Sequence, residues 1–208
     1  MARARDSRAE LVRTMARLLR DQGYTATGRA QLLAESGVSN GSLYHYFPGG
    51  MEELAEAALE ASGQAVADAL REALDGAPSA GDGVCRFLDM AAGPVGGEVC
   101  PGCPVAPTAL ESPIVSPRLR AAAARCFDQW EALIAARLRG DGWPEDSVRQ
   151  TASAVLALVE GALLLARVSG QGSHLSNAKV AALALLGAPQ RGSGPPKRTR
   201  SARERKQP

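Results

Sequence analysis

A run of hydrogen-bonding side chains falls within one short segment, residues 39–46. An Asn side chain can form paired hydrogen bonds with adenine, and hydroxyl groups can bond bases or phosphate oxygens. A glycine among them lets the backbone approach a surface closely. The members of this run are Ser39, Asn40, Gly41, Ser42, Tyr44, His45 and Tyr46. Three polar aromatic residues in a row cannot all face one small core, so the run indicates contact with DNA bases and phosphates.

The sequence around this run predicts a helix-turn-helix that would hold it in place. Thr27 is expected to cap a short helix that runs through Glu35, and a glycine-containing turn follows at residues 36–38. Ser39 is expected to cap the second helix, which ends at Pro48 because the residue before a proline is pushed out of the helical conformation. In this motif the N-terminal residues of the second helix reach base edges in the major groove.

Residues 8–60 resemble the TetR family of bacterial transcriptional repressors. The matching stretch is Gly37-Val38-Ser39-Asn40-Gly41-Ser42-Leu43-Tyr44-His45-Tyr46-Phe47, followed by a helix containing Glu52-Glu53-Leu54. Two further segments, Pro48-Gly49-Gly50 and Gly102-Cys103-Pro104-Val105-Ala106…Leu110-Glu111, resemble a narrower branch that responds to flavonoids and lincomycin-type antibiotics and controls multidrug efflux genes. The resemblance implies a homodimer that binds a palindromic double-stranded DNA operator and is released by a small-molecule inducer.

Two positions depart from the family pattern, which often has Lys where this chain has Asn40 and, in the branch, where it has Met51. A compensating cation is expected from Arg29 or from an N-terminal arm that carries Arg3, Arg5 and Arg8. The backbone N–H groups of Gly50 and Met51 are expected to bind phosphate at a helix start. The predicted DNA contacts are Thr27, Arg29, Ser39, Asn40, Gly41, Ser42, Tyr44, His45, Tyr46 and Gly50.

Cys100 and Cys103 form a Cys-x-x-Cys motif. A zinc site would need two further ligands at similar spacing, and a thioredoxin-type site would need a βαβ context; the sequence offers neither. Two alternatives stay open, a loop with apolar thiols and a redox-sensing pair. Cys85 and Cys126 lie on apolar helical stripes and are predicted to be core residues. No metal and no cofactor are expected.

The composition favours an all-α fold, because aromatic residues make up 4% of the chain and Ala and Leu are abundant. The apolar spacing predicts about nine helices. Their ranges are 7–22, 27–35, 39–47, 51–74, 84–92, 107–111, 117–139, 145–168 and 174–186. The chain is predicted to divide into a three-helix DNA-binding domain at 1–50, a helical ligand-binding and dimerisation domain at 51–187, and a basic disordered tail at 188–208.

The last two predicted helices are apolar on more than one face, which requires burial in an interface or a core. A four-helix dimer interface, with two helices from each copy, is the preferred interpretation, and a monomeric core is the alternative. Bulky side chains on the middle helices are candidate ligand contacts, because small-molecule pockets are mostly apolar. The candidates are Phe87, Met90, Leu110, Ile114, Phe127, Trp130 and Leu133. Glu160 and Arg167 either orient the ligand or share a solvent-facing stripe.

The net charge of +2 is a sum of three unlike segments. Residues 1–48 carry seven Arg and four acidic residues, residues 49–189 carry 10 basic and 17 acidic residues, and residues 190–208 carry seven basic residues and one Glu. Basic segments attract polyanions, and an acidic segment is repelled by them. The first segment therefore has the charge that a DNA-binding region needs.

Several protein classes are excluded by what the sequence lacks. No apolar run reaches the ~18 residues of a membrane span, and no signal-peptide core follows the N-terminus, so a cytoplasmic protein with no membrane partner is expected. No nucleophile–base pair, phosphate loop or metal cluster is visible, which argues against an enzyme. The expected function is a ligand-responsive repressor with an apolar or aromatic inducer. The alternative is a thiol-based redox regulator that uses Cys100 and Cys103.

Overall fold

The computed structural model describes residues 2–92 and 100–187, and the side chains of these residues from Ser7 onward. These residues form nine α-helices and no strand, as the sequence predicts. The helices are α1 Ala2–Gln22, α2 Arg29–Ser36, α3 Asn40–Tyr46, α4 Gly50–Asp75, α5 Ala80–Ala91, α6 Ala106–Val115, α7 Pro117–Gly140, α8 Glu145–Ser169 and α9 Ser173–Leu186. The predicted tail at 188–208 lies outside the described residues.

Three helices are longer than predicted, each for a local reason. α1 begins at Ala2 rather than at residue 7, in a polar segment where no apolar spacing marks a helix. α5 begins at Ala80 because the Ser79 hydroxyl accepts a hydrogen bond from the backbone N–H of Asp82 at 3.2 Å. α6 continues to Val115, past Pro113, and ends where Ser116 caps α7.

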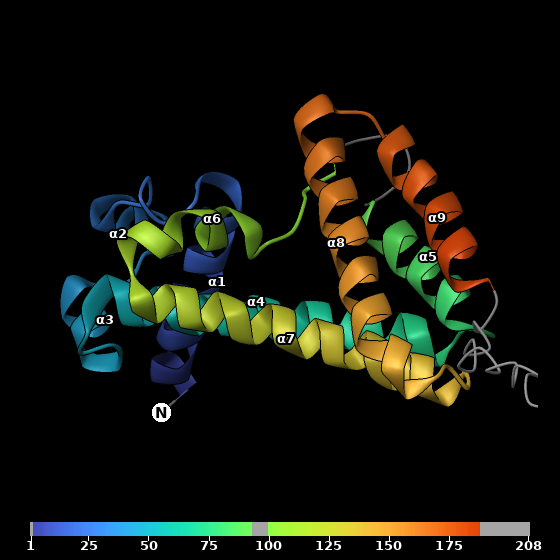
Figure 1. Cartoon of the computed structure of the whole chain (residues 1–208). Helices are drawn as coiled ribbons and strands as arrows, with labels where there is room; N and C mark the ends of the chain where they lie inside the picture. Colours follow the sequence, from blue (N-terminus) through green and yellow to red (C-terminus); the bar gives the residue numbers. More distant parts are fainter. Residues whose placement is uncertain (1, 93–99, 188–208) are drawn as a thin grey trace, which may run out of the picture.

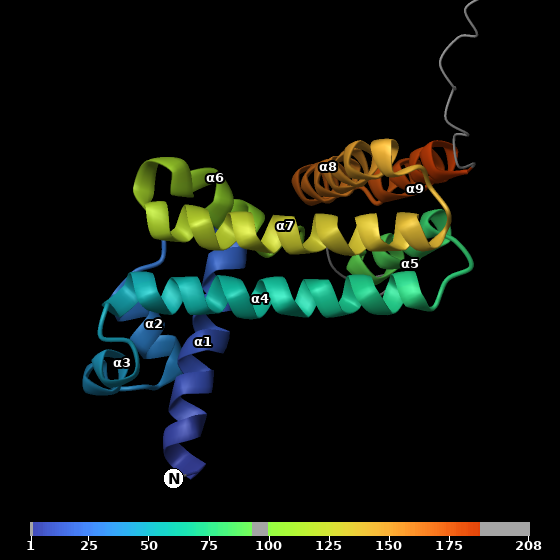
Figure 2. The ribbon, with the colours of Figure 1, turned by 60° about the horizontal axis from the view of Figure 1, so that its bottom comes forward.

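Two long helices, α4 and α7, run side by side in the same direction and form the spine of the molecule (Figures 1 and 2). At one end Arg125 pairs with Glu60 at 2.7 Å. Near the middle the indole N–H of Trp130 donates to the Gly63 carbonyl at 2.9 Å. A side chain at Gly63 would place its Cβ 2.3 Å from the Cys126 sulfur, so glycine is required where the two helices come closest.

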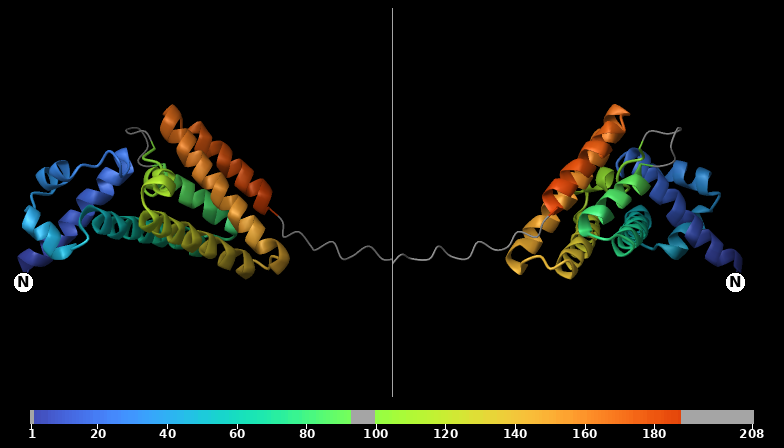
Figure 3. Two further views of the ribbon diagram at one scale, coloured as in Figure 1. Left: turned by 60° about the vertical axis from the view of Figure 1, so that its left-hand side comes forward. Right: turned by 90° about the vertical axis from the view of Figure 1, so that its right-hand side faces the viewer.

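The helices α5, α8 and α9 lie across one end of this spine, and α6 lies beside α1 at the other end (Figures 1 and 2). α8 packs against α7 and α9, and α9 packs against α5 (Figures 1 and 3). Six apolar side chains on α8 and α9 are exposed: Leu164, Leu165, Val168, Val180, Leu183 and Leu185. We call these six residues the α8/α9 face. We call α1–α3 with their turns, residues 2–49, the head, and α4–α9, residues 50–187, the body.

By length and composition α8 could cross a membrane, and 33% of its most apolar stretch is buried within the chain. Glu160 and Arg167 interrupt the apolar run, as the sequence indicates, but two charges are few enough for the helix to pass a test of length and mean composition. One such helix is weak evidence of a span, since core helices of soluble proteins pass the same test.

The head and the body are joined through α1, which packs against α2, α3, α4 and α6. Its buried stripe contains Leu11, Met15, Leu18 and Leu19. Beyond the end of α1, Glu111 of α6 accepts hydrogen bonds from the backbone N–H and the hydroxyl of Thr25, at 2.8 and 2.9 Å. The base of the head is therefore fixed to the body by polar contacts as well as by apolar packing.

Candidate DNA interface and ligand cavity

The helix α3 is held by a cap at its start and by apolar anchors along one side. Ser39 is its N-cap, as predicted, and its hydroxyl accepts a hydrogen bond from the backbone N–H of Ser42 at 3.2 Å. Leu43 and Phe47 are buried in the core. This orientation leaves the opposite side of α3 facing outward, at the end of the head (Figure 2).

Most of the predicted DNA contacts lie on this outward surface. Arg29, Ser39, Asn40, Gly41, Tyr44 and His45 are exposed. Ser42 and Tyr46 are half-buried, and the Tyr46 ring meets the edge of the His45 ring with 4.9 Å between centroids. Two of the three aromatic residues therefore point outward, and the third packs partly against the core.

Two predicted contacts are placed differently. Thr27 is not the cap of α2: Gly28 occupies that position, and the buried Thr27 hydroxyl donates to the Gly23 carbonyl at 2.6 Å. Gly50 is buried with φ +70°, and its N–H donates to the Phe47 carbonyl at 2.8 Å, so this N–H is already used and does not face a phosphate. The left-handed backbone at Gly50 forms the sharp joint between α3 and α4.

Two cations lie next to α3, where the sequence departs from the family's Lys residues. The Arg29 guanidinium donates to the Tyr44 hydroxyl at 3.0 Å. The Arg8 guanidinium lies 5.2 Å from the centroid of the Phe47 ring. Both were predicted to compensate, whereas Arg3 and Arg5 have side chains outside the described residues. A positive charge thus flanks α3 on the sides of α1 and α2.

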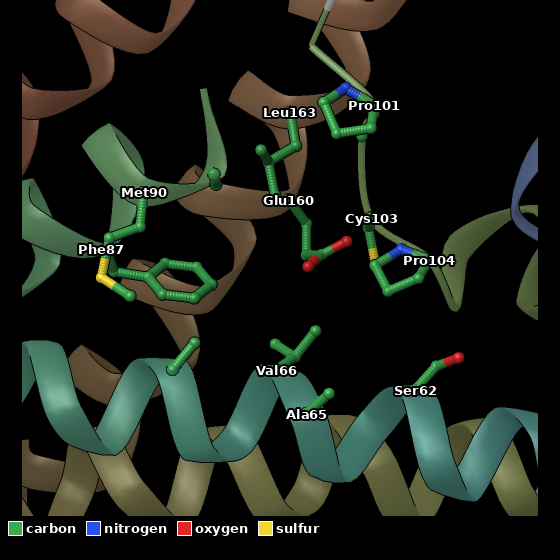
Figure 4. Close-up of a pocket in the computed structure, with 13 residues that line it drawn as sticks. Ser62, Ala65, Val66, Phe87, Met90, Pro101, Cys103, Pro104, Glu160 and Leu163 are labelled. Atoms are coloured by element: carbon green, nitrogen blue, oxygen red, sulfur yellow. The ribbon is translucent and has the colours of Figure 1, made fainter. Parts of the chain in front are cut away.

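The body contains a cavity of about 420 Å³ between α4, α5, α8 and the loop that precedes α6 (Figure 4). Three of the predicted ligand contacts line it, namely Phe87, Met90 and Glu160. Ten further residues complete the lining: Ser62, Ala65, Val66, Ala69, Ala91, Pro101, Gly102, Cys103, Pro104 and Leu163. Four of these, Ser62, Ala65, Val66 and Ala69, lie three or four residues apart on one face of α4 and were not among the predicted ligand contacts.

The other predicted ligand contacts lie elsewhere. Leu110 lines a second cavity of about 320 Å³ near the end of α1, and Ile114 is 93% exposed on α6. Trp130 lines a narrow extension of the first cavity beside Phe87, and Phe127 stacks edge-on against Trp130 with 5.2 Å between centroids. Leu133 is half-buried and packs against the core. The prediction for Ile114 is wrong, because its position on α6 faces away from the cavity.

Glu160 is the polar centre of this region, since it lines both cavities and the extension. Burial raises the pKa of its carboxyl group, and a hydrogen bond from the Cys103 thiol works in the opposite direction. Burial, with the nearby Glu160 carboxylate as a second cause, raises the pKa of the Cys103 thiol. The thiol is therefore a neutral donor rather than a reactive thiolate at neutral pH.

The four cysteines are free. Cys100 and Cys103 are buried and have different partners, because the Cys100 thiol donates to the Ala91 carbonyl at 3.7 Å. Cys126 is buried, as predicted. Cys85 is half-buried rather than a core residue, and its thiol donates to the Lys179 carbonyl at 3.7 Å where α5 meets α9.

Arg167 neither faces the first cavity nor shares a solvent stripe with Glu160. Its guanidinium donates to three backbone carbonyls: Arg20 at 2.8 Å, Pro101 at 3.0 Å and Asp21 at 3.1 Å. The sequence gives no signal for these contacts, because the acceptors are backbone atoms on elements far apart along the chain.

Comparisons with known proteins find matches for both the head and the body. A sequence model described as "Bacterial regulatory proteins, tetR family" matches residues 11–58, and one described as "Transcriptional regulator LmrA/YxaF-like, C-terminal domain" matches residues 82–181. Two curated relatives come from Bacillus subtilis. The uncharacterized HTH-type transcriptional regulator YxaF is 34% identical to this chain, and the match covers 77% of this chain and 84% of YxaF. The HTH-type transcriptional regulator LmrA is 31% identical, and the match covers 77% of this chain and 86% of LmrA.

Solved structures share the same arrangement of helices. The reduced form of Escherichia coli NemR superposes with a TM-score of 0.75 at 25% identity, and covers 88% of this chain and 99% of its own. A TetR transcriptional regulator from Chloroflexus aurantiacus superposes with a TM-score of 0.73 at 27% identity, over 88% and 96%.

Proposed function

The chain belongs to the TetR family of bacterial transcriptional regulators, and we propose that it is a repressor that binds a palindromic DNA operator as a homodimer and leaves it when an inducer binds. The DNA-binding part is the head, with its boundary near residue 50, and the rest of the described chain holds the ligand and the dimer contact. Such a repressor acts in the cytoplasm, where its operator is. The basic residues after 189 add salt-sensitive affinity for DNA.

The observation that carries this proposal is the division of α3 into a buried and an exposed side. Leu43 and Phe47 fix the helix in the head, while Asn40, Tyr44 and His45 are exposed. Exposed polar groups at the start of a helix-turn-helix recognition helix are placed to reach base edges, and Arg29 beside them is placed to reach phosphate.

The α8/α9 face supports dimerisation. It has six exposed Leu and Val side chains, and exposed apolar side chains that gather on one surface mark sites of protein contact. A second copy of the same face would cover them and form a four-helix interface with two-fold symmetry. That symmetry places two α3 helices in successive major grooves, which requires an operator with two inverted half-sites.

The cavity supports an inducer that acts through α4. Its floor is α4, and α4 follows α3 after only Phe47, Pro48 and Gly49. A ligand that changes the position of α4 therefore changes the distance between the two α3 helices of the dimer. It does so only if it binds the released state more tightly than the DNA-bound state.

The buried cysteines argue against the redox alternative. Cys100 and Cys103 are both buried and have separate backbone and carboxylate partners, so neither thiol has the exposure that a sensor cysteine needs, and burial also raises the pKa of the Cys103 thiol. Replacing both with Ser is expected to leave the response to oxidants unchanged.

Operator selection from randomised DNA tests the proposal. The wild-type dimer should enrich an inverted repeat, and the variant Tyr44→Ala/His45→Ala should lose affinity for it by 100-fold or more, since each specific contact contributes about 1–3 kcal/mol. Arg71→Ala, on an exposed part of α4 within the body, is the control and should bind normally. Full operator binding by a correctly folded double variant would overturn the placement of the recognition helix.

A further inference from the structure

The Glu160 carboxylate projects from α8 into the first cavity, between the Phe87 and Met90 side chains on one side and Cys103 on the other (Figure 4). Val66 and Ala65 of α4 face it from below. Glu160 is thus at the centre of an otherwise apolar space of about 420 Å³, a volume that suits a drug-sized molecule.

The charge of this carboxylate has no cationic partner within the cavity. Among the described residues that line it, Glu160 is the single charged side chain. The segment 93–99, which the structure does not describe, contains no Lys, Arg or His in its sequence. Cys103 donates one hydrogen bond, which leaves the remaining acceptor sites of the two carboxylate oxygens open to the cavity. An ionised carboxylate in such surroundings is costly until a cation or a donor compensates it.

The field around the cavity favours a cation over a neutral donor. Residues 49–189 contain 17 acidic and 10 basic residues, so the body attracts positively charged molecules. The cavity wall also offers the face of an aromatic ring, Phe87, which attracts cations.

We propose that the cavity binds lipophilic cations, apolar molecules of drug size that carry one positive charge against Glu160. This inference rests on the proposed function, because the cavity is then the inducer site. It goes beyond it by naming the charge of the ligand and the residue that selects it.

Binding to the unmodified full-length protein tests the charge preference with probes of matched shape. Tetraphenylphosphonium and tetraphenylborate have nearly the same size and opposite charge, and triphenylphosphine oxide is a neutral relative. Wild type is expected to bind the cation at least tenfold more tightly than either of the others in calorimetry. Glu160→Gln should remove this preference and leave the affinity for the neutral probe within threefold.

Three results would overturn the proposal. They are no binding of the cation to wild type, equal binding of all three probes, and an unchanged preference in Glu160→Gln. A neutral phenol that binds only when Glu160 is present, while the cation does not, would identify a hydrogen-bond site instead. Operator binding without any probe is measured in parallel: if it is intact, the proposed function stands even where the ligand class fails.

A second inference comes from Arg167, whose contacts do not depend on the ligand. Arg20 and Asp21 belong to the last turn of α1, where helix carbonyls lack partners within the helix, and the Arg167 guanidinium supplies donors to both. The same guanidinium binds the carbonyl of Pro101, which lines the ligand cavity.

Gly102 in the loop before α6 leaves room for the Arg167 side chain. Gly102 has φ +74°, and a Cβ at this position would lie 2.8 Å from Cδ of Arg167. A side chain at residue 102 would therefore strain the loop and displace the arginine.

We infer that Arg167 clamps the cavity wall to the end of α1, so that a movement of the wall reaches the head directly and not only through α4. Arg167 is a positioning residue in this arrangement, since it acts on the head through α1.

Hydrogen exchange of the full-length protein tests the clamp. Arg167→Ala and Gly102→Ala should each speed exchange at least tenfold both in the last turn of α1, residues 19–23, and in the loop 100–105. Glu111→Gln, which weakens the other link at Thr25, is the control and should leave the loop 100–105 unchanged. Faster exchange in the loop without any change in α1 would overturn the clamp, as would no change in either segment.

Discussion

The head and the body are both built from α-helices with the same kinds of apolar residue, but they pack to different degrees. In the head, each helix presents its apolar residues inward and its polar residues outward, with Leu32, Leu43 and Phe47 buried. In the body, a cavity of about 420 Å³ separates α4 from α8, and a carboxylate lies inside it. Closely packed interiors resist deformation, and cavities forgo the contacts that would resist it. The close packing of the head suits a fixed surface, and the cavity in the body leaves room for the inducer that we propose.

The largest expected effect lies at the seam between α4 and α7. Trp130→Ala removes a side chain that is 1% exposed and leaves the Gly63 carbonyl without its donor. We expect the free energy of unfolding to fall by about 3–5 kcal/mol, measured by denaturant titration. Phe127→Ala, at a half-buried neighbour, is the control and should cost less. An equal or smaller loss in Trp130→Ala would mean that the seam is as loose as the cavity.

A direct comparison of head and cavity comes next. Leu43→Ala, at a fully buried position of the head, should lower the free energy of unfolding by about 2–5 kcal/mol and weaken operator binding, because α3 loses its anchor. Met90→Ala, at a 48% exposed position beside the cavity, should cost less than about 1 kcal/mol, since little packing is lost. Both values come from the same denaturant titration. Similar losses of unfolding free energy in the two variants would mean that the head is not packed more closely than the cavity wall.

The head could be predicted from the sequence more fully than the body. The α3 cap, the turn before it and the stop at Pro48 depend on residues within a few positions of one another, so the sequence predicts them correctly. Thr27 was assigned wrongly because α2 begins one residue later, with Gly28 as its N-cap, and the buried Thr27 hydroxyl donates to the Gly23 carbonyl instead. A local pattern does not reveal that a hydroxyl will be buried against the preceding turn.

The cavity depends on how helices cross, which local patterns do not fix. Phe87, Met90 and Glu160 were found because each is conspicuous on its own helix. The face of α4 from Ser62 to Ala69 and the loop at 101–104 were missed, since small residues and prolines carry no ligand signal until α8 is placed opposite them. Ile114 was assigned wrongly for the converse reason: it is bulky and apolar, yet it points into solvent.

Helix caps give a smaller test that is matched between the two regions. Ser39→Ala in the head should cost about 0.5–2 kcal/mol of unfolding free energy, the usual range for an exposed N-cap. Ser116→Ala in the body should cost more than Ser39→Ala, because Ser116 is 2% exposed and its hydroxyl also donates to Glu52. Thermal and denaturant unfolding of both variants would measure the difference, with Ser169→Ala, near the exposed end of α8, as the control. A larger loss in the head variant would show that burial does not decide these caps.

The smallest expected effect is a dependence of stability on pH at Glu160. Burial raises the pKa of this carboxyl group in the folded protein above its value in the unfolded chain. The folded state then binds the proton more tightly, so its contribution to stability is complete below the unfolded pKa and is lost as the pH rises through the folded pKa. The stability of Glu160→Gln relative to wild type should therefore increase as the pH rises from about 4 to about 7.5, because only wild type bears the cost of ionising a buried carboxyl group.

Unfolding titrations of both proteins at the two pH values, without ligand, measure this difference. Glu145→Gln is the matched control with the opposite sign, because Arg139 holds the pKa of that exposed carboxyl below its usual range. The stability of that variant relative to wild type should fall slightly as the pH rises. A relative stability of Glu160→Gln that falls as the pH rises would mean that the Cys103 hydrogen bond outweighs the cost of burial. The cavity would then hold its carboxylate as firmly as the head holds its own polar groups.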